Sequence, residues 1–180
     1  MKKILAFAIA VLLVLSLGAC TFGGTNTTEQ KEVKEITKAV STPDEAIDAK
    51  KYADDLDGLC KYMTDKNCVY KFEKSTNDEI IDPIVMDADL IGAEQGYKFV
   101  YNYEGSEVVL ELYSYKDFDN QWYKQAKSEG KITISEDVEN GTFDVIVSKN
   151  GKYLMIYTDA ANRKDRRDAV IDIFNSFDFK

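Results

Sequence analysis

The chain has 180 residues, of which 23 are basic, 32 are acidic and none is histidine, so its formal net charge is −9. This length is typical of one domain around a single core. The acidic balance argues against nucleic acid as a partner, because phosphates are bound by clustered cations. The absence of histidine excludes Ser-His-Asp and Cys-His catalysis and every zinc site with imidazole ligands.

The first 19 residues have the pattern of an export signal. Met1-Lys2-Lys3 is a short positive start, an apolar run extends from Ile4 to Leu15, and small residues follow. As a helix, residues 4–19 would reach about 24 Å, less than the ~30 Å hydrocarbon core of a bilayer. The pattern therefore predicts a signal peptide rather than a permanent membrane span or a buried core helix.

Leu17-Gly18-Ala19-Cys20 follows this run directly. The motif resembles the lipobox of bacterial lipoproteins, with leucine three residues before the cysteine and small residues between them. The resemblance implies cleavage before Cys20, a covalent lipid on its sulfur and a place on the outer face of the cytoplasmic membrane, with the outer membrane as the alternative. Cleavage leaves 21 basic against 32 acidic residues, a net charge of −11. No family resemblance is found for residues 42–180.

Residues 20–41 are expected to form the lipidated N-terminus and a flexible tether, because they are mainly polar and contain one aromatic residue. A marginal helix carrying Val33, Ile36 and Val40 is the alternative. Residues 42–180 are expected to form a single folded domain.

A helix is predicted from Thr42 to about Thr64. Thr42 suits the N-cap, Pro43 the first helical position and Glu45 the third, which together make a capping box. Apolar residues then recur at steps of three and four and form one stripe: Ala49, Tyr52, Ala53, Leu56, Leu59, Cys60 and Met63. The acidic run at residues 54–58 lacks the terminal carboxylates of a calcium loop, so we interpret it as a solvated helix face.

The next two segments give weaker signals. A short strand is expected at residues 69–73. Residues 78–88 are ambiguous, because Pro83 interrupts an apolar run that otherwise suits a helical turn followed by an edge strand.

The period of the apolar residues changes to two from Tyr97 onward. Alternation predicts a hairpin of residues 97–103 and 108–115 around Glu104-Gly105-Ser106. A helix is then expected between an N-cap at Asp117 or Asp119 and Gly130.

Three strands and a last helix complete the expected order. The strands are expected near residues 132–134, 143–147 and 153–157, with a type I′ turn at Asn150-Gly151. The helix carries Val170, Ile173, Phe174 and Phe177. This order predicts an α+β fold, with a mainly antiparallel sheet of about five strands and helices packed against it.

Two cysteines remain once Cys20 carries a lipid. Cys60 and Cys68 form an even pair in an exported chain, which favours a disulfide. Closing so short a ring would stabilise the fold by about 2.5 kcal/mol. Two reduced cysteines packed as small apolar residues are the alternative, because Cys60 lies on the apolar stripe.

Aromatic residues are concentrated between residues 97 and 123. They are candidates for a surface that stacks on a glycan or anchors a protein partner: Tyr101, Tyr103, Tyr113, Tyr115 and Trp122. The alternative is a sheet face packed beneath helices, with the tyrosine hydroxyls at its rim.

All three arginines lie close together, at Arg163, Arg166 and Arg167. On a helix they fall within about 60° of Val170, on the apolar side. Either their stems cover apolar surface while their heads reach water, or they converge on an anion such as a lipid headgroup, a wall phosphate or an acidic partner.

These patterns favour a non-catalytic binding or interaction module of the cell envelope. The expected partners are the bilayer, through the lipid on Cys20, and an envelope protein or glycan. We nominate no catalytic residue, no metal site and no cofactor other than the covalent lipid. A small envelope hydrolase using paired carboxylates is one alternative, although 32 acids do not identify a pair. An inhibitor or immunity-type lipoprotein is the other.

Overall fold

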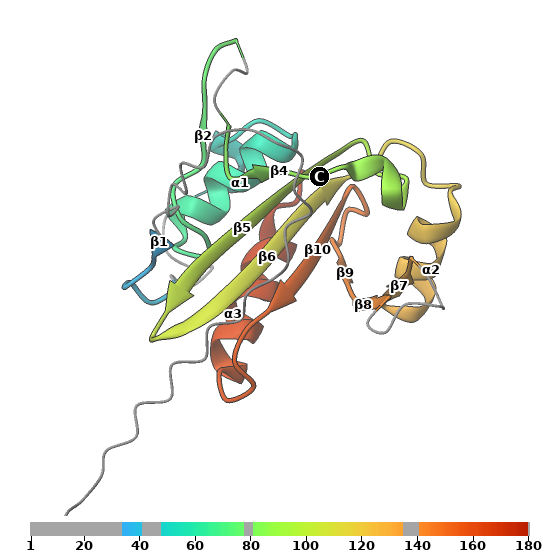
Figure 1. Ribbon diagram of the computed structural model, residues 1–180. Coiled ribbons are helices and arrows are strands. Elements are labelled where there is room, and N and C mark those ends of the chain that lie inside the picture. The colour runs from blue at the N-terminus through green and yellow to red at the C-terminus, as the bar shows by residue number, and fades with distance from the viewer. Residues whose placement is uncertain (1–33, 41–47, 78–80, 135–140, 180) are drawn as a thin grey trace, which may run out of the picture. The chain divides into compact units, whose positions relative to one another are not determined.

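A computed structural model describes residues 34–40, 48–77, 81–134 and 141–179 (Figure 1). The signal peptide, Cys20 and the expected capping box at Thr42 lie outside these residues. The chain divides into residues 1–31 and a compact unit of residues 32–180, and every described element belongs to the second unit. No helix in the described part of the chain has the length and apolar content needed to cross a bilayer.

A long antiparallel hairpin forms the centre of the sheet. Strands β5 (Gln95–Tyr103) and β6 (Ser106–Ser114) pair along their whole length. Glu104 and Gly105 make the turn between them with φ angles of 48° and 76°. Two consecutive positive φ values give a turn whose twist matches that of the strands, so the expected hairpin is confirmed.

Four shorter strands extend this sheet on both sides of the hairpin: β1 (Lys34–Glu35), β4 (Ile84–Val85), β9 (Ile146–Val147) and β10 (Tyr153–Thr158). The strand β10 pairs antiparallel with β6, and β9 pairs antiparallel with β10. Along the outer edge of β5, β4 pairs antiparallel and β1 pairs parallel. Two small two-stranded sheets are formed by β2 (Glu73–Lys74) with β3 (Ile81–Asp82) and by β7 (Lys131–Thr133) with β8 (Thr142–Asp144).

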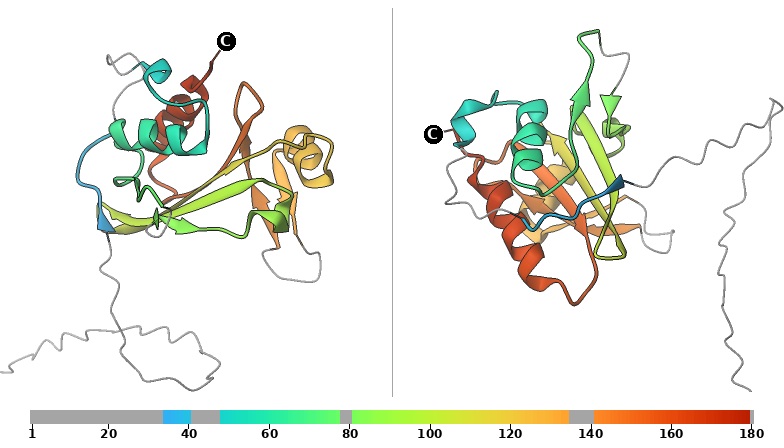
Figure 2. Two further views of the ribbon diagram at one scale, coloured as in Figure 1. Left: turned by 90° about the horizontal axis from the view of Figure 1, so that it is seen from above. Right: turned by 90° about the vertical axis from the view of Figure 1, so that its left-hand side faces the viewer.

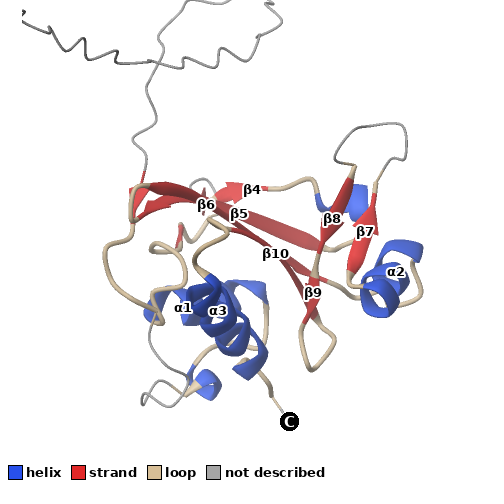
Figure 3. Cartoon of the chain, turned by 90° about the horizontal axis from the view of Figure 1, so that it is seen from below, coloured by secondary structure: helices blue, strands red, loops and turns tan. Residues whose placement is uncertain are grey.

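The described residues contain three α-helices and two short 3₁₀-helices: α1 (Leu56–Asp65), α2 (Gln121–Glu129), α3 (Lys164–Ser176), η1 (Ala49–Lys51) and η2 (Ala88–Ile91). Helices α1 and α3 lie side by side on one face of the sheet, and α2 lies with β7 and β8 at its far end (Figures 2 and 3). The α+β class with a mainly antiparallel sheet, expected from the sequence, is confirmed.

The two faces of the sheet bury different clusters. The main core lies between the sheet and helices α1 and α3, and its largest fully buried side chains include Tyr62, Tyr97, Phe99, Tyr101, Phe174 and Phe177. A smaller second core joins η2, α2 and β7 to the opposite face, and includes Tyr113, Tyr115, Tyr123, Ala126, Ile132 and Leu154. The period-two alternation of β5 and β6 sends neighbouring residues to these two sides.

Helix α1 begins later than the sequence predicted. Its N-cap is Asp55, whose carboxylate accepts a hydrogen bond from the Gly58 amide at 2.7 Å. The stripe residue Ala49 lies instead in the 3₁₀-helix η1, which is capped by Asp48. Aspartate is a strong N-cap and breaks the register of the stripe, so the prediction of one continuous helix is wrong for residues 48–55.

Two turn details also differ from the expectation. Helix α2 is capped by Asn120, whose side-chain oxygen accepts from the Tyr123 amide at 2.8 Å, rather than by Asp117 or Asp119. At the turn before β10, Gly151 has a φ of 77°, but Asn150 is not among the residues with positive φ. A type I′ turn needs both, so the position of that turn was right and its type was wrong.

The folded unit begins earlier than residue 42. Residues 34–40 contribute β1 and the buried side chain of Ile36, whose amide donates to the Asn102 carbonyl at 2.9 Å. Lys34 lies 4.4 Å from the centre of the Tyr70 ring and pairs with Asp82. Burial of Ile36 and the pairing of β1 with β5 thus hold residues 34–40 in the folded unit, although their composition predicted a tether.

Candidate functional site

A groove of about 270 Å³ opens on the face of the sheet opposite α1 and α3. Its floor comes from β5, β6 and β10, and its two walls come from η2 with the preceding Met86 and from the β7–β8 hairpin. The residues that line it are Met86, Asp87, Leu90, Ile91, Lys98, Glu111, Tyr113, Ile132, Ile134, Phe143 and Ile156. We call this cavity the groove.

Large apolar side chains stand exposed on both walls of the groove. Leu90 on η2 is 59% exposed, and Ile134 and Phe143 on the other wall are 45% and 37% exposed. Ile84, which is 41% exposed, lies opposite Lys98 in the β4–β5 pairing and therefore faces the same side of the sheet. An apolar cavity bordered by exposed apolar residues is a typical place for a ligand or partner to bind.

The floor of the groove contains one polar group of three side chains. Lys98 and Glu111 are directly opposite each other on β5 and β6, with Nζ and Oε1 3.0 Å apart. The other carboxylate oxygen of Glu111 accepts a hydrogen bond from the Tyr113 hydroxyl at 2.7 Å. Burial, together with the charge of Glu111, raises the pKa of Tyr113, so this hydroxyl remains a donor at physiological pH.

Gly96 allows the Tyr113 ring to pack closely against β5. It is paired with Tyr113, whose ring lies across it. A Cβ atom on Gly96 would lie 2.5 Å from the Tyr113 ring and 3.1 Å from Cβ of Met86. Only a residue without a side chain allows this cross-strand packing.

The expected aromatic surface is not formed. Tyr101, Tyr113 and Tyr115 are at most 4% exposed, and Tyr103 and Trp122 are half-buried. The alternative interpretation is right that Tyr101, Tyr113 and Tyr115 pack beneath other elements, but these residues lie on both faces of the sheet, and the Tyr101 hydroxyl is buried rather than at the rim. The aromatic side chains that are exposed are Phe118, at 45%, and Phe143, at 37%.

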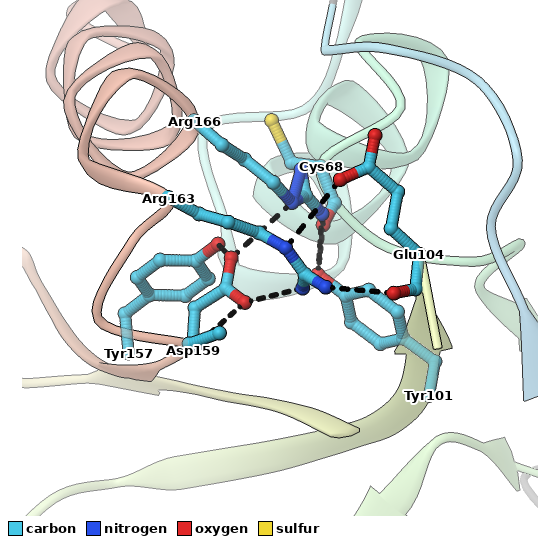
Figure 4. Close-up of polar contacts among 8 residues, drawn as sticks. Cys68, Tyr101, Glu104, Tyr157, Asp159, Arg163 and Arg166 are labelled. Carbon is cyan, nitrogen blue, oxygen red and sulfur yellow. Dashed lines mark hydrogen bonds and ion pairs between the residues drawn. The ribbon is translucent and has the colours of Figure 1, made fainter. Parts of the chain in front are cut away.

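The three arginines do not converge on a surface anion either. Arg163 and Arg166 both point at Asp159, which directly follows β10 (Figure 4). Arg167 is exposed. Arg163 Nη1 lies 2.7 Å and Arg166 Nε 3.5 Å from the carboxylate oxygens of Asp159. The hypothesis of a shared anion site is therefore wrong, because an internal carboxylate occupies the position of the anion.

Arg166 is inside the main core beside two tyrosines. Its guanidinium donates to the Tyr101 hydroxyl at 2.9 Å and lies 4.2 Å from the centre of the Tyr103 ring. The Tyr101 hydroxyl in turn donates to the Cys68 carbonyl at 2.6 Å. Helical spacing placed Arg166 correctly on the apolar side of α3, and the sheet supplies its partners.

This burial gives a prediction for alkaline pH. Burial raises the pKa of Tyr101 to about 12, against about 10 in an unfolded chain. Between these values only the unfolded chain loses the proton, so the free energy of unfolding falls as pH rises, by about 3 kcal/mol for this tyrosine. Urea unfolding at about pH 8, 10 and 11 measures the fall, and Tyr101→Phe should reduce its slope. An unchanged slope in that variant would contradict the prediction.

Cys60 and Cys68 are free thiols, and both are completely buried. The structure thus has the reduced pair that the sequence left as the alternative to a disulfide. Cys60 packs in the main core from α1, and the Cys68 thiol donates weakly to the Lys66 carbonyl at 3.9 Å. Burial raises the pKa of the Cys68 thiol to about 12, which removes its nucleophilic form at neutral pH.

Other parts of the described chain offer less for a ligand. No group of three or more histidine, cysteine, aspartate or glutamate residues suited to a metal lies among the described residues. Two wider hollows of about 680 and 490 Å³ flank Phe118, and both are lined largely by polar side chains. The groove is the place where exposed apolar side chains from separate segments meet.

The sequence patterns did not identify the groove. Ile134 and Phe143 were assigned to strands, and Leu90 was assigned to no element. At Ile134 and Phe143 the signal was an isolated large apolar residue between polar neighbours, as in Thr142-Phe143-Asp144, whereas Leu90 is followed by Ile91. Such residues are common on surfaces, so only their proximity in space gives them significance. No family model, no curated protein and no solved structure matches this chain.

Proposed function

We propose that this protein is an exported bacterial lipoprotein, anchored through Cys20, whose α+β domain is a non-catalytic binding module with the groove as its ligand site. The lipobox supports the anchor, and the groove supports the binding role. The 14 residues from Cys20 to Val33 span at most about 50 Å when extended. An anchored domain therefore stays close to the membrane surface and meets ligands there.

The observation that carries the binding role is the exposure of Leu90, Ile134 and Phe143 around one cavity. Full burial of a side chain of this size is worth about 1.5–3 kcal/mol, and these three forgo much of that gain in the unliganded protein. A partner that covers all three recovers it.

Two little-exposed carboxylates of the described chain do not form a hydrolytic pair. Asp159 and Glu111 are the least exposed acids in the ion pairs, with side chains 3% and 13% exposed. Asp159 interacts with Arg163 and Arg166 on the side of α1 and α3, while Glu111 faces the groove and interacts with Lys98. The two therefore lie on opposite sides of the sheet, which does not suit a pair acting on one bond.

The anchor is tested by acyl labelling in a bacterial host. Mature protein should incorporate a labelled fatty acid, and Cys20→Ala should abolish both the label and signal-peptide cleavage. Cys68→Ala is a control, because that thiol is buried in the domain. Unlabelled wild-type protein would overturn the anchor.

The groove is tested separately by photocrosslinking in the same cells. A benzophenone amino acid at position 90 should give a defined adduct, whereas the same residue at position 118, which is similarly exposed outside the groove, should not. Ile134→Asp should remove the adduct at position 90 without unfolding the domain, because Ile134 is 45% exposed. Equal adducts at positions 90 and 118, or none at either, would contradict a ligand site in the groove.

A further inference from the structure

We infer that the ligand of the groove is a cationic amphipathic peptide segment, in which large apolar side chains enter the cavity and a neighbouring lysine or arginine meets Asp87. This inference rests on the proposed function, because it names the class of partner for the same site.

The size of the cavity favours side chains over a whole small molecule. Its volume of about 270 Å³ is slightly below the range of roughly 300–1,000 Å³ that holds drug-sized ligands. The exposed apolar residues Leu90 and Phe143 stand on opposite walls, so a segment lying between them contacts both. A peptide that presents one apolar stripe fits this arrangement, in the same way as a helix in a hydrophobic groove.

The charges at the groove favour a cation beside that stripe. Lys98 and Glu111 neutralise each other on the floor. Asp87 lines the groove and is exposed, and its carboxylate caps no helix and has no partner among the described residues. It stands three residues before Leu90, at the edge where the polar face of a bound amphipathic peptide would emerge. A lysine or arginine there gains an ion pair without displacing an existing one.

The net negative charge of the whole chain also favours a cationic ligand. The formal net charge is −9, and it becomes −11 if residues 1–19 are removed. A field of this sign increases the association rate of cationic ligands and slows that of anionic ones. An anionic lipid headgroup would have to approach Asp87 and Glu111, which is unfavourable.

The experiment uses the mature acylated protein in nanodiscs of zwitterionic phosphatidylcholine, with empty nanodiscs as the baseline. The probes are three labelled peptides of about 14 residues: a leucine–lysine amphipathic peptide, a leucine–glutamate peptide of the same pattern, and a serine–lysine peptide of the same charge. Fluorescence anisotropy should show binding of the leucine–lysine peptide at least about tenfold tighter than that of the other two.

Two matched pairs of variants locate the contacts. Asp87→Asn should weaken binding of the leucine–lysine peptide about threefold to tenfold, whereas Asp89→Asn, which makes the same charge change two residues later and outside the groove, should not. Leu90→Ser should weaken it similarly, and Phe118→Ser should not. All four side chains are exposed, so the fold should survive each change.

Each outcome tests either the class of peptide or the groove as a binding site. Equal binding of the leucine–glutamate peptide would overturn the cationic ligand and leave the groove as a binding site. Equal binding of the serine–lysine peptide would show that charge alone drives association, and would also overturn the inference. If no peptide binds while the adduct at position 90 persists in cells, the peptide class is wrong and the proposed function stands. If both fail, the proposed function fails too.

Discussion

Asp159→Ala is expected to lower the free energy of unfolding by about 3–5 kcal/mol, a large part of the total stability of a domain this size. The side chain of Asp159 is 3% exposed. Its carboxylate accepts hydrogen bonds from Arg163 Nη1, the Tyr157 hydroxyl and the Ala160 amide, each at 2.7 Å. One side chain thus satisfies groups from β10, the following loop and α3.

The loss is large because the arginines remain buried. The side chain of Arg166 is 6% exposed, and its Nε and Nη1 have no hydrogen-bond partner among the described residues, so the ion pair with Asp159 offsets the cost of burying its charge. Without Asp159 that charge stays in the core beside neutral groups, which include the Tyr101 hydroxyl, the Cys68 carbonyl and the Tyr103 ring. Removing one member of a buried pair costs much more than replacing the whole pair by apolar groups.

A double-mutant cycle separates these contributions. Urea unfolding of Asp159→Ala, Arg166→Met and the double variant should show that Arg166→Met recovers part of the stability lost in Asp159→Ala. Asp168→Ala removes an exposed acid from the same helix and should change stability by less than about 0.5 kcal/mol. A loss below about 1 kcal/mol in Asp159→Ala would show that the buried pair is not what holds α3 to the sheet.

Gly58→Ala is expected to destabilise the protein by at least about 2 kcal/mol, although alanine in place of glycine usually stabilises a helix by about 1 kcal/mol. Gly58 is the third residue of α1, and the carbonyl of Ala53 packs against it. A Cβ atom at Gly58 would lie 2.0 Å from the Ala53 oxygen and 2.8 Å from its carbonyl carbon. Both are backbone atoms, so the clash moves the chain rather than a side chain.

Thermal and urea unfolding followed by circular dichroism measure this effect. Lys61→Ala, at an exposed position of the same helix, is the control and should be nearly neutral. If Gly58→Ala matches or exceeds the wild-type stability, the close approach of Ala53 does not constrain the start of α1.

The sequence correctly predicted the elements that are defined by the spacing of residues close together in the chain. The hairpin of β5 and β6 follows from strict alternation and from Glu104-Gly105, whose positive φ values suit the turn. Helix α3 follows from Val170, Ile173 and Phe174, which all face the core. Gly130, with a φ of 66°, ends α2 where the sequence placed its end.

Helix α1 shows where such patterns fail. Ala49 and Tyr52 continue the apolar stripe of α1, but they belong to η1 and to the connection after it. The sequence pattern favoured an N-cap at Thr42, and helical periodicity did not indicate the N-cap at Asp55. The packing of Ala53 against Gly58 and the bond from Gly58 to Asp55 fix the start of the helix.

The sequence by itself determined the acidic charge, which follows from composition, and predicted the export signal, the lipobox and the α+β order of elements, which depend on neighbouring residues. Only the tertiary structure decided the rest. Asp159 meets Arg163 and Arg166 because β10 delivers it beneath α3, and Leu90 meets Ile134 and Phe143 because η2 and the β7–β8 hairpin border one sheet face. Contacts between residues far apart in the chain produce no periodic pattern in the sequence, so the groove could be identified only from the folded structure.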